Sequence, residues 1–98
     1  KTKQNWFIVG VRFATGEIQE MLKLNESPKV AEILGNKEGF RPYITSTIGV
    51  IKKDIKSKDK NIYTRKREDI DLILNYCKEN NLTVCQDFKD KIKHIISD

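Results

Sequence analysis

Residues 5–13 alternate between a strongly apolar face and a less apolar one, which we interpret as the pattern of a β-strand. Every second side chain from Phe7 to Phe13 is apolar, so these residues would share the face turned toward a core. The Ala-Thr-Gly sequence at 14–16 indicates a turn, and the apolar pattern over 17–24 then predicts a returning strand. An N-terminal β-hairpin is therefore the first expected element.

A short helix is predicted to follow the hairpin. Ser27 is a favourable N-cap residue, and Pro28 suits the first helical position, where no partner for an N–H is needed. Gly35 is expected to end the helix, because glycine readily adopts the left-handed conformation found beyond helix C-termini. Pro42 disfavours helical geometry at Arg41, so the chain around these two residues is expected to form a loop.

The second half of the chain is predicted to contain further strands and two helices. Residues 43–51 are rich in β-branched side chains, which favour a strand, and residues 61–64 are expected to pair with it. Apolar side chains spaced for one helical face predict a helix over 64–80. After a short extended piece at 82–85, Asp87 is expected to cap a final helix. The apolar residues of that helix are Phe88, Ile92, Ile95 and Ile96.

These elements predict an α+β fold in a single domain spanning residues 1–98. An antiparallel sheet of three to five strands would consist of the N-terminal β-hairpin and the strands that follow the short helix. The two C-terminal helices would pack on one face of that sheet. The chain contains no apolar run of about 18 residues, so no membrane-spanning segment is expected. With only two cysteines, both expected to be reduced thiols, the sequence is typical of a cytoplasmic protein.

Charged residues are distributed unevenly along the chain. Residues 41–67 hold nine lysines and arginines against two acidic residues, whereas residues 68–98 hold four against seven. The middle of the chain is thus a basic block, and an acidic, helical C-terminal third is expected to follow it. A basic block can attract phosphate groups, although a lysine-rich loop can also simply keep a small protein soluble.

Aromatic residues lie among the cations of the basic block, and aromatic rings can stack on nucleic-acid bases. Arginine offers phosphate a planar fork of hydrogen-bond donors that lysine lacks, so the arginines are the preferred phosphate contacts. The predicted phosphate-binding residues are Arg41, Tyr43, Lys52, Lys53, Lys56, Tyr63, Arg65, Lys66 and Arg67.

Residues with catalytic or metal-binding chemistry are sparse. Cys77, Cys85 and His94 are spaced too widely for a structural zinc site, which needs closely spaced pairs of ligands. Cys77 lies on the apolar face of its predicted helix and is expected to be buried and inert. The sequence has neither a phosphate-binding P-loop nor a recognisable nucleophile motif. We therefore predict no enzymatic activity, no metal and no cofactor.

The sequence predicts a small non-enzymatic protein that uses the basic block to bind a phosphate-bearing ligand, either a nucleic acid or a nucleotide. The alternative is a protein-interaction module of the phage or plasmid type that inhibits a host system, for example by sequestering a nucleotide signal. A homodimer or higher homo-oligomer is also expected, because Trp6, Ile8 and the last helix present apolar surface that a small domain has few ways to cover. No membrane partner is expected.

Overall fold

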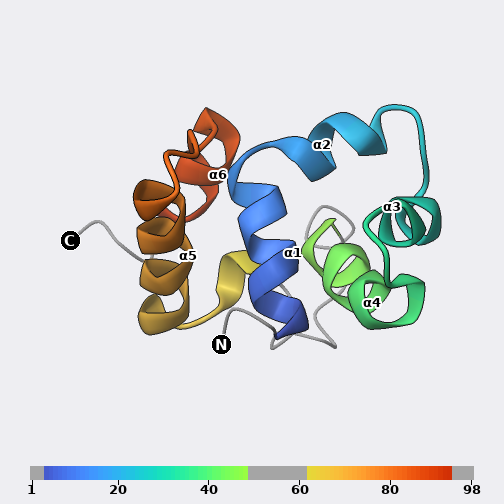
Figure 1. Cartoon of the computed structure of the whole chain (residues 1–98), viewed down its shortest axis with the longest axis horizontal. Helices are drawn as coiled ribbons and strands as arrows, with labels where there is room; N and C mark the ends of the chain where they lie inside the picture. Colours follow the sequence, from blue (N-terminus) through green and yellow to red (C-terminus); the bar gives the residue numbers. More distant parts are fainter. Residues whose placement is uncertain (1–3, 49–61, 94–98) are drawn as a thin grey trace.

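The computed structural model describes residues 4–48 and 62–93, and every regular element in these ranges is a helix (Figure 1). In chain order the elements are α1 (Asn5–Ala14), α2 (Glu17–Leu22), α3 (Ser27–Ile33), α4 (Lys37–Ile48), the short 3-10 helix η3 (Ile62–Thr64), α5 (Arg67–Glu79) and α6 (Gln86–Lys91). No strand occurs among the described residues, so the predicted α+β fold with its antiparallel sheet is wrong. Within the same ranges, no helix has the length and apolar character needed to cross a membrane.

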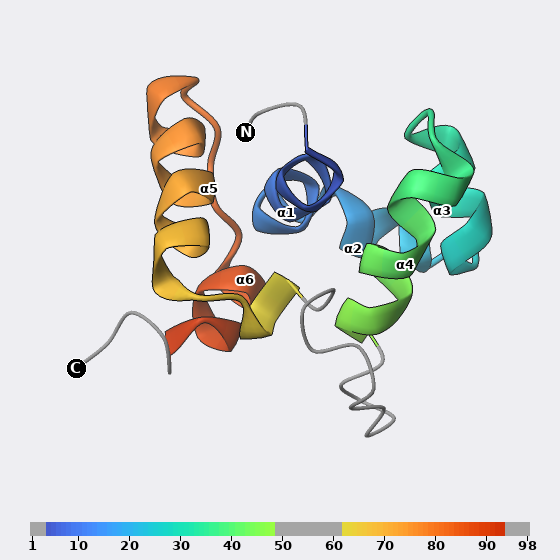
Figure 2. The same cartoon turned by 90° about the horizontal axis from the view of Figure 1, so that it is seen from below.

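Helix α1 passes through the centre of the molecule, between α5 on one side and α2 and α4 on the other (Figure 2). Because neighbours surround α1, most of its circumference is buried, including the side chains of Trp6, Phe7, Val9 and Phe13. A helix buried on most sides has apolar residues at most positions, and such a run also contains the alternation expected of a strand. This ambiguity explains why the predicted first strand is wrong.

Two helices joined at the same turn replace the predicted hairpin. Gly16 has φ +83°, a left-handed conformation that suits glycine, and it separates α1 from α2. Residues 17–24, which the pattern predicts as a returning strand, form α2 and the beginning of the connection to α3. Ile18 anchors α2, because its side chain is fully buried in the core.

The loop and the strand predicted around Pro42 form one helix, α4, so both predictions are wrong for the described residues. Asn36 caps this helix, since its side-chain oxygen accepts a backbone N–H of the first turn at 3.0 Å. Phe40, Ile44 and Thr47 follow one another at helical spacing and are all buried. Their burial offsets the loss of the hydrogen bond that Pro42 cannot donate within the helix.

The remaining strand predictions fall on η3 or partly outside the described residues. Residues 49–51 and residue 61 belong to the stretch 49–61, which the structure does not describe. Ile62 and Tyr63 are buried in η3, so the strand predicted over 61–64 is wrong for its described part.

Helices α3, α5 and α6 are confirmed, with small differences at their ends. Ser27 is the first residue of α3, so Glu26 rather than Ser27 occupies its N-cap position. Gly35 has φ +108° just beyond α3, as expected of a residue that ends a helix. Helix α5 begins at Arg67 rather than at residue 64. Cys85, rather than Asp87, occupies the N-cap position of α6.

Three of the side chains that led us to expect a homodimer contribute to the core of the single chain, whereas Ile8 is half-buried and Ile95 and Ile96 lie outside the described residues. Trp6, Phe88 and Ile92 are at most 7% exposed. The homodimer stays a prediction, to whose interface the buried Trp6, Phe88 and Ile92 would contribute little. Among the described residues, the large hydrophobic side chains that remain exposed are Leu24, Ile33 and Leu82.

Candidate functional site

The basic block contributes exposed cations at two places in the described fold. Arg41 is exposed on α4, and Lys66 and Arg67 are exposed where α5 begins. The predicted phosphate contacts that lie outside the described residues are Lys52, Lys53 and Lys56.

The cations at the start of α5 have acidic neighbours. Lys66 Nζ lies 3.7 Å from a carboxylate oxygen of Glu68, and Arg67 Nε lies 3.9 Å from one of Asp71. These surface ion pairs reduce the positive charge that a ligand would meet at this end of the helix.

Arg65 is held within the fold by two neighbouring side chains. Its Nε donates a hydrogen bond to Asp69 Oδ2 at 2.9 Å, and its guanidinium lies 4.4 Å from the centre of the Trp6 ring. The side chains of Arg65 and Asp69 are 18% and 7% exposed. The Trp6 indole N–H donates in turn to Gln4 Oε1. This cluster ties the start of α5 to the start of α1.

The two tyrosines predicted to contact a ligand occupy different environments. Tyr43 is half-buried on α4 and packs against the core. Tyr63 is 7% exposed, and its ring centre lies 5.8 Å from that of Phe13 and 5.8 Å from that of Phe88. Tyr63 is therefore a core residue, and it also forms part of the wall of a pocket.

This pocket, which we call the Tyr63 pocket, has a volume of about 360 Å³ and lies where α1, α2, α4, η3 and α6 meet. Phe13, Leu22 and Ile48 provide apolar walls beside the Tyr63 ring. A few polar groups in an otherwise apolar pocket are typical of ligand-binding sites. The polar lining residues are Gln19, Thr47, Asp87 and Lys91.

Asp87 and Lys91 form the charged part of the Tyr63 pocket. Lys91 Nζ donates to Asp87 Oδ1 at 2.9 Å and lies 5.6 Å from the centre of the Tyr63 ring. The Gln19 amide donates to Asp87 Oδ2 at 3.3 Å. These hydrogen bonds, that from Lys91 above all, lower the pKa of Asp87, so its side chain is a carboxylate at neutral pH.

Tyr63 supplies a protonated hydroxyl to the same group of side chains. Burial raises the pKa of Tyr63, and the negative charge of Asp87 raises it further. A hydrogen bond with the Asp87 carboxylate acts in the same direction, since it favours the phenol over the phenolate. The Gln19 side chain also donates to the backbone carbonyl of Phe13 at 2.9 Å, whereas its buried Oε1 has no hydrogen-bond partner among the described residues.

Thr47 connects α4 to η3, the elements before and after the stretch 49–61, at the wall of the Tyr63 pocket. Its Oγ1 accepts the backbone N–H of Ile62 at 2.9 Å and donates to the backbone carbonyl of Tyr43 at 2.6 Å. Thr47 is 1% exposed, so both hydrogen bonds lie in the interior of the protein. Ile48 and Ile62, the residues on either side of this stretch, are therefore held close to the pocket.

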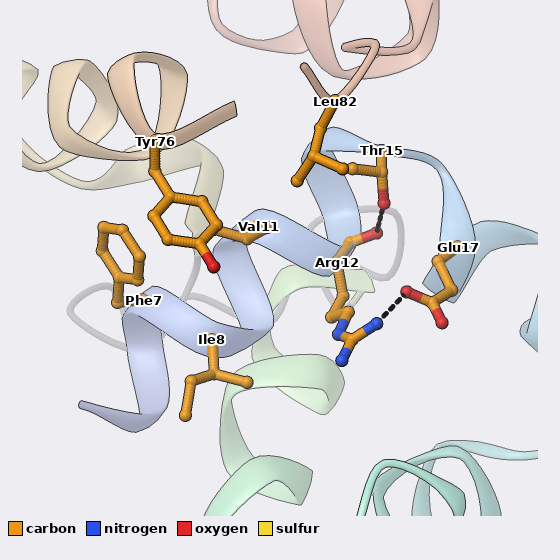
Figure 3. A pocket seen from close by; sticks show the side chains of 8 residues that line it. All are labelled: Phe7, Ile8, Val11, Arg12, Thr15, Glu17, Tyr76 and Leu82. Carbon is orange, nitrogen blue, oxygen red and sulfur yellow. Dashed lines mark hydrogen bonds and ion pairs between the residues drawn. The ribbon is translucent and has the colours of Figure 1, made fainter. Parts of the chain in front are cut away.

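A second hollow, the α1–α5 groove, has a volume of about 590 Å³ (Figure 3). Phe7, Ile8 and Val11 line it from α1, Tyr76 lines it from α5, and Leu82 lines it from the chain that follows α5. The remaining lining residues, at one end of the groove, are Arg12, Thr15 and Glu17.

Within the described ranges, no group of three or more histidine, cysteine and acidic side chains is placed to hold a metal ion. Cys77 is fully buried, as predicted, and burial raises the pKa of its thiol. Cys85 is half-buried, and its Sγ lies 3.6 Å from the backbone oxygen of Phe13. Both thiols are free, and His94 lies outside the described residues.

The predicted phosphate contacts do not all gather at one site. Tyr63 lines the Tyr63 pocket together with Phe13, whereas Arg65 lies against Trp6, seven residues earlier on α1 and thus about 10 Å away along the helix axis. Sequence reasoning missed the polar lining residues of the pocket. A signal for two of them was present, because Asp87 and Lys91 stand four residues apart, which is the spacing of an ion pair on a helix.

Comparison of the chain with protein families, with characterised proteins and with solved structures finds no match. The function must therefore be inferred from the residues and their arrangement.

Proposed function

We propose that this chain is a non-catalytic binding protein for a small phosphate-bearing ligand of about nucleotide size, with the ligand held at the Tyr63 pocket. The observation that carries the proposal is the hydrogen bond from Ile62 N–H to Thr47 Oγ1, which holds two residues on either side of the stretch 49–61 together beside the pocket. This stretch, which we call the basic stretch, lies within the basic block and holds five lysines and two aspartates.

Chain connectivity limits how far these lysines can lie from the pocket. None of the five is more than six residues from Ile48 or Ile62. Six residues span at most about 20 Å even when fully extended. Lys52, Lys53 and Lys56 are therefore within reach of a phosphate whose attached group occupies the pocket, and opposite charge favours that contact.

The pocket itself suits an apolar or aromatic group rather than a phosphate. Phe13, Leu22 and Ile48 are apolar, and the Tyr63 ring lies beside them. The Asp87 carboxylate disfavours an anion within the pocket, although Lys91 balances its charge. A volume of about 360 Å³ lies near the lower end of the range for small-molecule pockets, roughly 300–1,000 Å³, so one base with its sugar is a reasonable occupant.

The polar groups of the pocket support binding more than catalysis. Thr47 Oγ1 is engaged in two backbone hydrogen bonds. Asp87 accepts hydrogen bonds from Lys91 and Gln19 and is held as the carboxylate. A nucleophile with an adjacent general base, as covalent catalysis requires, is not found among the described lining residues.

The test uses three probes that divide the proposed ligand into its parts: adenosine monophosphate, adenosine and inorganic phosphate, each titrated by calorimetry. Adenosine monophosphate should bind more tightly than either part, because the base would occupy the pocket while the phosphate meets lysines. Equal affinities for adenosine and adenosine monophosphate would contradict the role of the basic stretch.

The variant for this test replaces Lys52, Lys53 and Lys56 together with alanine. The loss of one charged hydrogen bond, about 1.5–3 kcal/mol, should weaken binding of adenosine monophosphate at least tenfold and leave the affinity for adenosine unchanged. The control replaces the same number of exposed lysines elsewhere, Lys23, Lys29 and Lys37, and so removes the same net charge. Equal effects of the two variants would show that only overall charge matters.

A nucleic acid is the second candidate ligand, and the exposed side chains of Arg41, Lys66 and Arg67 favour it. These residues lie outside the lining of the Tyr63 pocket, so a long polyanion would be needed to contact them as well as the basic stretch. Affinity for a single-stranded oligonucleotide would then fall steeply with salt, because each phosphate that is neutralised releases a counterion. A shallow salt dependence, similar to that of the mononucleotide, would favour the nucleotide.

A further inference from the structure

The α1–α5 groove is lined by different residues from the Tyr63 pocket. The residues of α1 that line the groove, among them Phe7, Ile8 and Val11, recur at helical spacing and form one face of that helix. Phe13, the α1 residue of the Tyr63 pocket, is absent from the groove lining. The groove is thus a separate site, independent of the function proposed for the Tyr63 pocket.

The charged residues of the groove neutralise each other. Arg12 Nη1 lies 2.6 Å from Glu17 Oε2, and the Thr15 hydroxyl donates to the Arg12 backbone carbonyl at 3.2 Å (Figure 3). Among the described residues, no other charged side chain lines the groove. An anion or a cation would therefore have to compete with an ion pair that is already formed, whereas a neutral molecule would not.

Tyr76 provides a polar group in the apolar part of the groove. Its ring stands at 90° to that of Phe7, with 5.3 Å between the ring centres, and its hydroxyl points over α1 (Figure 3). No hydrogen bond between this hydroxyl and another described residue is found, so it can pair with one donor or acceptor of an occupant.

We propose that the α1–α5 groove binds a small, neutral, largely aromatic or aliphatic molecule that carries one hydrogen-bonding group for Tyr76. The volume of about 590 Å³ lies well within the range of small-molecule pockets, roughly 300–1,000 Å³. A protein partner is the poorer fit. Of the residues that line the groove, Leu82 is the one large hydrophobic side chain that is itself exposed, so the groove does not extend into a broad apolar surface.

Two fluorescent dyes that differ in charge test this proposal. N-phenyl-1-naphthylamine is neutral and carries one N–H group, whereas 8-anilino-1-naphthalenesulfonate has the same aromatic body with a sulfonate added. Trp6, the single tryptophan, lies 5.6 Å from Phe7 of the groove, measured between ring centres, so energy transfer from Trp6 detects a bound dye, and the variants of groove residues show whether it lies in the groove. The neutral dye should bind saturably and more tightly than the sulfonate.

The variant Leu82→Lys places a positive charge at the groove, in a residue that is already 39% exposed and lies outside the helices. The substitution should weaken binding of the neutral dye and strengthen binding of the anionic dye. The ratio of the two affinities should thus change by about tenfold or more. Partial unfolding would instead change both affinities in the same direction. In the control, Leu24→Lys, the lysine replaces a side chain that is 89% exposed and outside the groove, and the ratio should stay as in the natural chain.

A second variant, Tyr76→Phe, removes only the hydroxyl and should weaken the neutral dye severalfold while leaving the helical circular dichroism unchanged. The proposal is overturned if the neutral dye does not bind, or if Leu82→Lys leaves the ratio of affinities the same as Leu24→Lys does. If the neutral dye binds as expected but Tyr76→Phe has no effect, the proposed hydrogen bond to Tyr76 is wrong.

Discussion

Arg65 shows how its neighbours in the fold change the role that its sequence suggests. In the sequence it is one cation of a basic run, and we predict a phosphate contact from it. In the fold its guanidinium lies between the buried Asp69 carboxylate and the Trp6 ring. Phosphate binding by Arg65 would have to break this arrangement. The contacts of Arg65 instead hold the start of α5 against α1.

The first prediction concerns this ion pair. Arg65→Ala should lower the free energy of unfolding by about 3 kcal/mol, because it leaves the Asp69 carboxylate nearly buried without its cation. Urea denaturation followed by circular dichroism measures the loss. The control is Arg67→Ala, which breaks an exposed pair with Asp71 and should cost about 1 kcal/mol or less. Similar losses in the two variants would show that the Arg65 pair is no stronger than a surface pair.

The second prediction concerns the pH dependence contributed by Asp87. Its pKa is lowered in the folded protein, chiefly by the hydrogen bond from Lys91, so the folded state binds the proton less readily than the unfolded state. Asp87 therefore contributes stability above its unfolded pKa of about 4, and this contribution is lost as pH falls through the folded pKa. The free energy of unfolding should thus decrease less steeply with falling pH in Asp87→Asn than in the natural chain.

The measurement for Asp87 is a set of urea titrations between neutral and acidic pH. The difference in stability between the natural chain and Asp87→Asn should be largest near neutral pH and shrink as the solution is acidified. A difference that stays constant with pH would mean that Asp87 acts through packing or its hydrogen-bond geometry and not through its charge.

At the scale of elements, the sequence predicts helices α3, α5 and α6 but not α1, α2 or α4. The three that are predicted carry end signals or clear helical spacing, such as Pro28, Gly35 and the apolar face around Ile73. Helix α1 lacks a polar face because it lies at the centre of the molecule, and Pro42 masks the helical spacing of α4. In both helices tertiary packing decides the conformation, which the local pattern does not reveal.

The candidate site was predictable only in part, for a related reason. Tyr63 is predicted as a ligand contact because it lies in the basic block, and the structure places it at a pocket. Gln19 reaches that pocket from α2, which the sequence predicts as a strand. Asp87 and Lys91 reach it because α6 folds back toward η3, a long-range arrangement with no local signal.

The third prediction tests the close approach of α1 and α5 at Gly10. A Cβ atom at position 10 would collide with Cδ1 of Ile73, which is fully buried and has little room to move. Gly10→Ala should therefore lower the free energy of unfolding by about 1–3 kcal/mol through overpacking, despite the better helix propensity of alanine. Thermal or urea denaturation gives this value directly.

The matched control for Gly10 is a double-mutant cycle with Ile73→Val, which removes the colliding Cδ1 atom. Gly10→Ala should be much less harmful in that background, and the two substitutions should couple favourably by about 1 kcal/mol. Additive effects would place the cost of Gly10→Ala elsewhere than in the contact with Ile73.

At the scale of the whole molecule, α1 connects two groups of helices. Helices α3 and α4 pack together on one side, α5 and α6 lie on the other, and α1 contacts members of both groups (Figures 1 and 2). The Tyr63 pocket draws residues from both sides, with Ile48 from α4 and Asp87 from α6. The Cα radius of gyration of 12.4 Å is close to the value of about 13 Å expected for a single compact domain of this length.

The last prediction follows from the central position of α1. If neither group of helices has a complete core without it, the chain should unfold in one cooperative transition. Fluorescence of Trp6 reports the junction of α1 with Arg65 at the start of α5, while far-UV circular dichroism reports all of the helices. The two signals should therefore give the same midpoint and slope in urea. An earlier loss of Trp6 fluorescence, with part of the helical signal retained, would show that some helices remain folded after the junction of α1 with α5 has opened and that the chain is not one cooperative domain.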